Sequence, residues 1–139
     1  MDRRDIETDL RERVASSAFH SWMGMKLVRA EPGRVEIALE AADHHLNLQG
    51  LPHGGVVATL ADTATGLAVR SRLPAGRRHV TVQLDVHYLR PGAPGRVTAV
   101  GTAVRVGTSI GYAEADVTDE RGRLLARATA TVAVMADRG

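Results

Sequence analysis

A lone carboxylate lies in the middle of the most apolar helical stretch of the chain. Asp62 is preceded by VVATLA and followed by TATGLAV, so a helix through this stretch surrounds it with small and apolar side chains. Burying a carboxylate without a partner is costly, and the usual position of an Asp on a solvated helix face does not fit these neighbours. The pattern therefore favours a functional role for Asp62.

Two glycines, Gly54 and Gly55, begin the same stretch at the point where a polar loop becomes a helix. The first N–H groups of a helix lack internal partners and carry the positive end of its dipole, and without a Cβ a ligand oxygen can approach them closely. This arrangement is typical of an oxyanion hole, which stabilises charge on a carbonyl under attack. Asn47 and His53 lie just upstream and can donate to the same oxygen, although a structural hydrogen bond is the alternative for His53.

The spacing between these groups carries a further prediction. Asp62 follows Gly54 by eight residues, or about 11–12 Å along a helix axis. A carboxylate at that distance cannot easily act on an oxygen held at the N-terminus of its own helix. A second copy of the helix could supply Asp62 from the other chain, so hydrolysis by this sequence predicts a composite site between subunits.

Periodicity predicts the elements that must position these groups. An amphipathic helix is expected over residues 2–20, with apolar residues at every fourth position, and a hairpin over 26–41. A polar loop over 42–53 leads into a helix from Gly54 to about Leu73. From His79 onward the pattern predicts strands, with strict alternation over 80–88 and further strands over 96–106, 110–118 and 123–134.

This order of elements predicts one α+β domain over residues 1–139, made of an N-terminal helical segment (1–22) and a core (26–135). A meander of antiparallel strands after one long helix favours packing of that helix on a sheet. The helix is apolar nearly all round, so a curved sheet and a neighbouring subunit are expected to cover it.

Composition excludes several classes of protein. The 139 residues include no cysteine, so there is no thiolate metal site or Cys nucleophile, and the net charge is only +2 with arginines interleaved with acids. Neither nucleic-acid binding nor a membrane span is expected, and with no signal peptide the expected location is the cytoplasm. His44, His45 and His53 lack metal-ligand spacing, and the adjacent histidines His44 and His45 are expected to be solvated loop residues, so no metal is predicted. Asp85 and His87 favour a polar outer face or a subunit contact over an acid–base pair.

Several motifs resemble those of the hotdog-fold acyl-CoA thioesterases, in particular the PaaI-type branch named for phenylacetate degradation. These are Asn47, Gly50, the His53-Gly54-Gly55 run and the stretch LADTA over residues 60–64. The resemblance runs from about Lys26 to Val134 and includes TVQLDVHYLRP and the turn over 119–122. It implies a hotdog fold, in which an antiparallel curved sheet wraps around one long central helix.

The resemblance also implies an activity and roles for residues. The activity is hydrolysis of an acyl-CoA thioester, with the Gly54 N–H and Asn47 polarising the carbonyl and His53 shaping the same pocket. Asp62 of the partner chain would act as general base or nucleophile. Thr81 would help to hold the water, although the strand alternation places it on the face opposite Val80 and Val82.

Further expectations concern ligands and partners. Gly55 and Arg90, which precedes Pro91 and Gly92, are expected to contact the substrate, with Arg90 at a phosphate of coenzyme A. No cofactor is expected, and the resemblance implies at least a homodimer and pairing of dimers into a homotetramer. Two alternatives remain: a non-catalytic module that binds or senses acyl-CoA, and a hotdog-fold dehydratase or hydratase. Retention of Asp62 disfavours the first, and the poor match of Asp43-His44 to an Asp/His pair disfavours the second.

Overall fold

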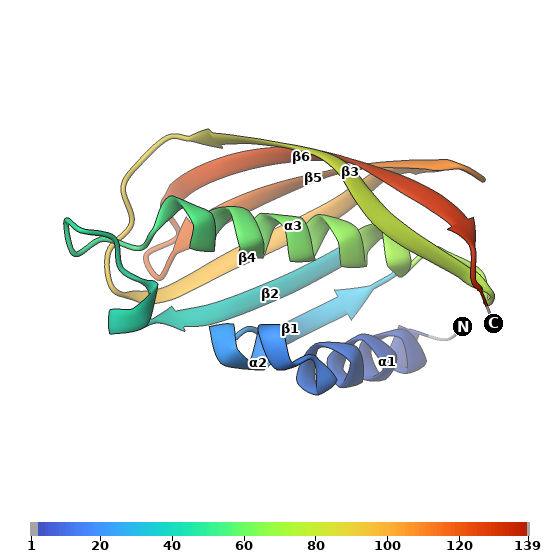
Figure 1. The fold of residues 1–139 in the computed structure, drawn as a ribbon, viewed down its shortest axis with the longest axis horizontal. Helices are drawn as coiled ribbons and strands as arrows, with labels where there is room; N and C mark the ends of the chain where they lie inside the picture. Colours follow the sequence, from blue (N-terminus) through green and yellow to red (C-terminus); the bar gives the residue numbers. More distant parts are fainter. Residues whose placement is uncertain (1–2, 139) are drawn as a thin grey trace.

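In the computed structural model, which describes residues 3–138, six antiparallel strands curve around one long helix (Figure 1). The helices are α1 (Arg3–Ser16), α2 (Ala18–Met23) and α3 (Gly54–Arg70), with a short 3-10 turn, η1 (Asp43–His45). The strands are β1 (Lys26–Glu31), β2 (Arg34–Ala41), β3 (Arg77–Tyr88), β4 (Gly95–Val106), β5 (Ile110–Asp119) and β6 (Leu124–Ala136). In the sheet they follow the order β1-β2-β4-β5-β6-β3. The predicted α+β hotdog fold is confirmed.

The central helix α3 lies against the concave face of the sheet, and small residues allow a close approach. Leu60, Ala61 and Ala64 are fully buried. A Cβ added at Gly101 of β4 would lie 2.2 Å from the Ala64 carbonyl oxygen, so only glycine lets the strand and helix backbones come this close. The helix ends at Arg70, three residues before the predicted end at Leu73.

Strand β3 contains a β-bulge between Thr81 and Gln83. Before the bulge Thr81 faces α3 while Val80 and Val82 are 49% and 60% exposed. After the bulge Leu84 and Val86 pack against the core instead. The prediction of strict alternation over 80–88 is therefore wrong, because one extra residue shifts the two-residue period by one position.

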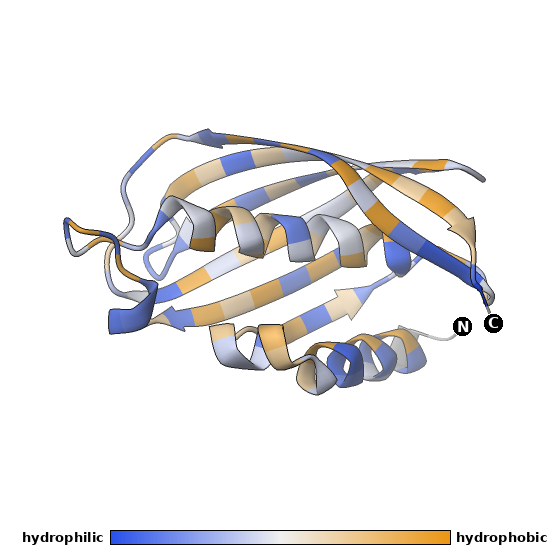
Figure 2. Ribbon diagram, in the orientation of Figure 1, coloured by the Kyte–Doolittle hydropathy of each residue, from blue (hydrophilic) through white to orange (hydrophobic). Residues whose placement is uncertain are grey.

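The N-terminal segment forms two helices rather than the single predicted helix. The Ser17 hydroxyl caps α2 by accepting from the His20 N–H at 3.3 Å, and its backbone is extended, so α1 ends before it. Ile6, Leu10 and Val14 are buried as predicted, and Figure 2 shows α1 as hydrophobic on one side and hydrophilic on the other. Residue 2, the first of the predicted helix, lies outside the described part of the chain.

The loop before α3 is anchored by a buried histidine. His45 is buried, its Nδ1 accepts from the Ala42 N–H at 2.9 Å, and its Nε2 lies 2.7 Å from the Met23 carbonyl oxygen. The prediction of a solvated His45 is therefore wrong: the imidazole ties the loop to the end of α2. His44 is exposed, as predicted.

Candidate active site

The N-terminus of α3 presents one unoccupied N–H group. His53 is the N-cap, and its Nδ1 accepts from the Gly55 N–H at 2.8 Å. The Gly55 N–H, predicted to contact the substrate, is thus already engaged, whereas the Gly54 N–H has no acceptor among residues 3–138. A neutral imidazole that accepts through Nδ1 carries its proton on Nε2. His53 is exposed, so this Nε2–H can donate to a ligand.

Tyr88 packs closely against Gly54. Its hydroxyl donates to the Gly54 carbonyl oxygen at 2.6 Å, and its ring lies 3.3 Å from the position that a Cβ on Gly54 would occupy. The ring is 55% exposed. Sequence reasoning missed Tyr88, although an aromatic residue at a strand end, next to a predicted phosphate contact, is a usable signal.

The side chain of Asn47 is oriented by its own loop. Its Oδ1 accepts from the Gln49 N–H at 2.8 Å and from the Leu51 N–H at 3.1 Å. These two bonds fix which end of the carboxamide faces the loop backbone. Its Nδ2 has no acceptor within the described chain and remains a donor for a ligand.

A cavity of about 360 Å³ brings Asn47, Gly54, Tyr88 and Arg90 together, with an apolar lining that includes Leu125. A neighbouring hollow of about 580 Å³ extends from Asn47 to His53. Asp62 lines neither of them. We call Asn47, His53 and Gly54 the carbonyl half-site, because each has a free donor and lines one of these two adjoining cavities, with Asn47 lining both.

Asp62 forms the second part of the site together with Thr81. The Thr81 hydroxyl donates to Asp62 Oδ1 at 2.8 Å. Asp62 Oδ2 has no partner in the portion that the structure describes, and the side chain is half-buried in the single chain. We call this pair the carboxylate half-site. One oxygen is held in place and the other is available to a water or a substrate.

Two histidines lie near the carboxylate half-site, one on α2 and the other on β3. His20 of α2 has its Nε2 3.3 Å from the hydroxyl of Thr63, the residue after Asp62. His79 of β3 lies over Gly66, where its Nε2 is 3.3 Å from the position of a Cβ. Burial lowers the pKa of both imidazoles, and the Asp62 carboxylate opposes this change.

Sequence reasoning missed both histidines. His20 is brought to Asp62 by the break at Ser17, for which the helical periodicity gave no signal. His79 is two positions before Thr81 on β3, so the alternation of the strand could have predicted that both lie on the same face.

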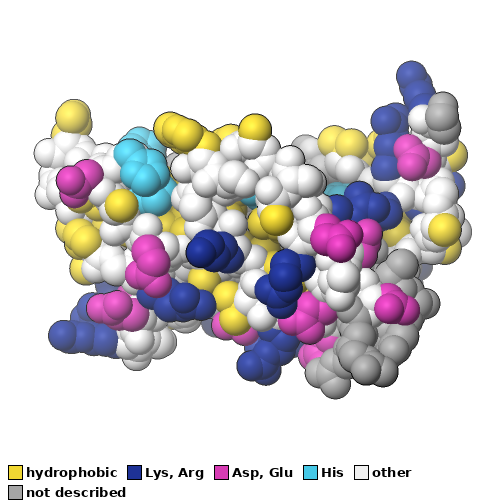
Figure 3. All heavy atoms as spheres, turned by 90° about the horizontal axis from the view of Figure 1, so that it is seen from below, with side chains coloured by type: hydrophobic (Ala, Val, Ile, Leu, Met, Phe, Trp, Pro, Cys, Tyr) yellow, Lys and Arg dark blue, Asp and Glu magenta, His cyan; other side chains and the backbone are white. Residues whose placement is uncertain are grey.

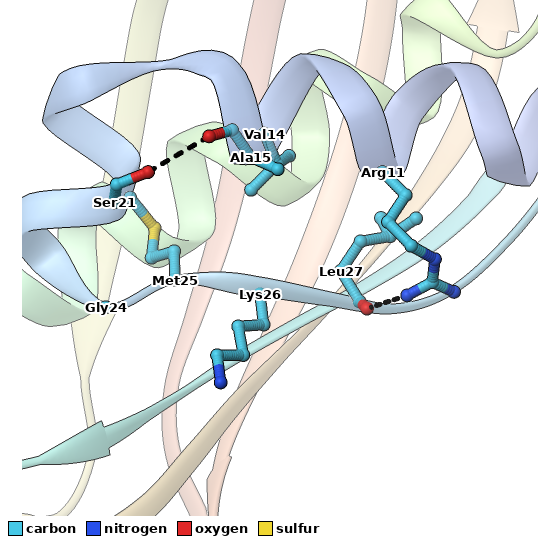
Figure 4. A pocket seen from close by; sticks show the side chains of 8 residues that line it. All are labelled: Arg11, Val14, Ala15, Ser21, Gly24, Met25, Lys26 and Leu27. Carbon is cyan, nitrogen blue, oxygen red and sulfur yellow. Dashed lines mark hydrogen bonds between the residues drawn. The ribbon is translucent and has the colours of Figure 1, made fainter.

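Three further cavities of the described chain are lined by none of the predicted site residues. A cavity of about 420 Å³ lies between α1 and β1 (Figure 4). None of the predicted site residues lines it, and the Arg11 guanidinium there donates to the Leu27 carbonyl oxygen at 2.6 Å. On the face in Figure 3, Lys and Arg side chains intermingle with Asp and Glu. Across residues 3–138, no cluster of three or more His, Asp or Glu side chains could hold a metal, and no helix has the length and apolar character needed to cross a membrane.

Comparison with known proteins agrees with this arrangement. The sequence profile of the thioesterase superfamily matches residues 49–126. The chain is 37% identical over 121 residues to a provisionally described esterase of Halobacterium salinarum, covering 84% of this chain and 80% of that protein. It is 31% identical over 134 residues to the medium/long-chain acyl-CoA thioesterase YigI of Escherichia coli, covering 84% of each.

A solved structure of a variant of the phenylacetic acid degradation protein PaaI from Thermus thermophilus is also similar. It superposes with a TM-score of 0.77 at 33% sequence identity, covering 84% of this chain and 98% of that one. The chain therefore belongs to the thioesterase superfamily and is a hotdog-fold thioester hydrolase similar to the PaaI type.

Proposed function

We propose that the chain hydrolyses an acyl-CoA thioester to a free acid and coenzyme A at a composite site between two subunits. The observation that carries this proposal is the separation of the two half-sites. The free Gly54 N–H and the Asn47 amide border a cavity that Asp62 does not line. Two turns of α3 lie between Gly54 and Asp62, so the catalytic carboxylate comes from the partner.

The mechanism assigns one task to each half-site. The thioester carbonyl oxygen accepts from the Gly54 N–H and from Asn47 Nδ2, which stabilise the negative charge that develops on it. Asp62 of the other chain takes a proton from the attacking water through Oδ2, or attacks directly, while Thr81 holds Oδ1. The coenzyme A thiolate is a good leaving group, so no metal or cofactor is needed.

The edge of the sheet supports a dimer of this kind. β3 pairs with β6 on one side only, so its other edge is unpaired within residues 3–138. An exposed strand edge readily pairs with another strand. Because β3 also contacts α3 through Thr81 and Asp62, pairing of β3 with its copy would bring two α3 helices close to each other. Dimers would then pair into a cytoplasmic homotetramer.

The acyl-CoA substrate is supported by a relative and by the cavity. The similar protein YigI is named as a medium/long-chain acyl-CoA thioesterase. Arg90 lies at the cavity of the carbonyl half-site and is exposed. Its guanidinium is suited to a coenzyme A phosphate, because it can donate two parallel hydrogen bonds to phosphate oxygens.

A subunit-mixing experiment tests the composite site. Asp62→Asn and Asn47→Ala are prepared separately, and each is expected to lose nearly all release of free thiol from acyl-CoA. Mixed in equal amounts through refolding, they form heterodimers in which one site has both half-sites intact. About a quarter of the wild-type activity should therefore return, since half of the dimers carry one of two sites.

Each outcome of the mixing experiment has a clear meaning. A site built within one chain would regain nothing, and that result would contradict the composite arrangement. Mixing Asp62→Asn with Thr81→Ala is the matched control. Both changes damage the carboxylate half-site, so each site of that heterodimer keeps a defect.

A further inference from the structure

Phe19 of α2 is an exposed aromatic residue whose contacts lead to Asp62. It is 53% exposed, and its ring meets the His20 ring edge-on, with centroids 5.6 Å apart and an interplanar angle of 78°. His20 in turn contacts Thr63, next to Asp62. Other exposed apolar residues have different neighbours: Trp22 lies by His44, with ring centroids 5.9 Å apart, and Val80 and Val82 face away from α3.

The break between α1 and α2 holds Phe19 in this place. The Ser17 hydroxyl accepts from the His20 N–H and also lies 2.6 Å from His20 Nδ1. These two contacts fix the start of α2 and the orientation of the His20 ring. The helix, AFHSWM, contains no Asp, Glu, Lys or Arg. The helix therefore brings no carboxylate, lysine or arginine to this side of α3, and Phe19 is the exposed aromatic residue next to His20.

The β3 side of α3, near His79, is less suited to an apolar group. His79 lies there, and burial lowers its pKa, with a further contribution from the positive charges of Arg70 and Arg13. An apolar group beside these cations would weaken their hydration without replacing it. On the α2 side, by contrast, Leu67 lies one helical turn beyond Thr63 and is only partly buried.

We propose that Phe19 is a specificity-determining residue, whose ring forms a wall of the acyl-group pocket beside Asp62. This inference rests on the proposed function, because it places the acyl group next to the catalytic carboxylate. The acyl group that fits is apolar and longer than acetyl, and it lies between α2 and α3. The wall belongs to the N-terminal helices, outside the 49–126 segment matched by the superfamily profile.

The test compares three substrates: acetyl-CoA, octanoyl-CoA and benzoyl-CoA. Phe19→Ala should lower kcat/KM for octanoyl-CoA and benzoyl-CoA by about tenfold, mainly through KM, because it removes apolar contact area from the pocket. Hydrolysis of acetyl-CoA should stay within about twofold of wild type. Phe19→Leu should restore kcat/KM for octanoyl-CoA more than for benzoyl-CoA, because leucine supplies aliphatic contact area but no aromatic ring.

Trp22→Ala is the matched control, since Trp22 is an exposed aromatic residue of the same helix with a contact to His44. Trp22→Ala should leave kcat/KM for all three substrates unchanged. An equal loss on all three substrates in Phe19→Ala, or the same loss in Trp22→Ala, would overturn the proposal. So would a change of oligomeric mass in Phe19→Ala, measured by light scattering, because a second copy would then cover the ring.

A binding measurement separates this proposal from the proposed function. In an Asp62→Asn background, octanoyl-CoA should bind more tightly than free coenzyme A. Phe19→Ala should reduce the ratio of these two dissociation constants by about tenfold. Normal turnover by Asp62→Asn would contradict the proposed mechanism alone. An unchanged binding difference in Phe19→Ala would contradict the acyl wall alone.

Discussion

At the scale of single residues, the free atoms of the site are defined by the bonds their neighbours make. Asn47 keeps Nδ2 as a free donor because its Oδ1 is held by two backbone N–H groups. Asp62 offers Oδ2 because Thr81 holds Oδ1. His53 occupies the Gly55 N–H and leaves that of Gly54. These bonds determine which atom of each residue stays free to donate or accept a hydrogen bond.

The Thr81 hydroxyl can be removed with little change of shape. Thr81→Val should lower kcat about tenfold, because a hydrogen bond to a charged group is worth roughly 1.5–3 kcal/mol and here holds the reacting carboxylate. Steady-state thiol release measures the effect. Thr81→Ser, which keeps the hydroxyl, should stay near wild type. Equal activity of the Val and Ser variants would show that the bond has no part in catalysis.

At the scale of elements, alternation and helical period predicted most of the fold. The strands after α3, the hairpin over 26–41 and the buried stripe from Ile6 to Val14 all follow from where apolar residues recur. The break at Ser17 and the bulge in β3 do not. Each depends on tertiary contacts that override a local period, such as the His20–Thr63 contact and the pairing of β3 with β6.

The same distinction applies to the site. Asn47, His53, Gly54 and Asp62 stood out because glycines, a loop and a carboxylate occur at unusual spacing. His20 is an ordinary residue in sequence, and only folding brings it to Thr63, whereas His79 and Tyr88 had weaker signals in their positions along β3.

The contact between α3 and β4 gives a prediction about stability. Gly101→Ala should destabilise the fold by about 3 kcal/mol, the upper end of overpacking costs, because the new Cβ meets backbone atoms that cannot rotate away. Thermal unfolding measures the loss. The neighbouring Thr102→Ala is the control, because Thr102 is exposed and points away from the helix. Equal melting temperatures for both variants would contradict the close approach seen at Ala64.

At the scale of the whole molecule, the two half-buried histidines near Asp62 link stability to pH. Burial lowers the pKa of His20 and of His79 in the folded chain. In the unfolded chain both titrate near their ordinary value of about 6.5. The unfolded state therefore binds more protons as the pH falls below that value, and folding loses free energy there.

This linkage predicts a measurable slope. The melting temperature should fall as the pH is lowered from about 7 toward 5, and the double variant His20→Gln/His79→Gln should show a shallower fall. His87→Gln, on the exposed outer part of β3, is the matched control and should follow wild type. Parallel curves for wild type and the double variant would assign the acid sensitivity to other groups.

The bulge in β3 has a consequence for chain length as well as for residue identity. Thr81 on one side of it serves the carboxylate, while Leu84 and Val86 on the other side fill the core. A regular strand over the same residues would alternate without interruption, so that either the hydroxyl or the two apolar side chains would point outward. Deleting Val82, the exposed residue of the bulge, would instead leave Thr81, Leu84 and Val86 on one face. The extra residue therefore allows a chain of this length to turn both ends of β3 inward, one toward the carboxylate and the other toward the core.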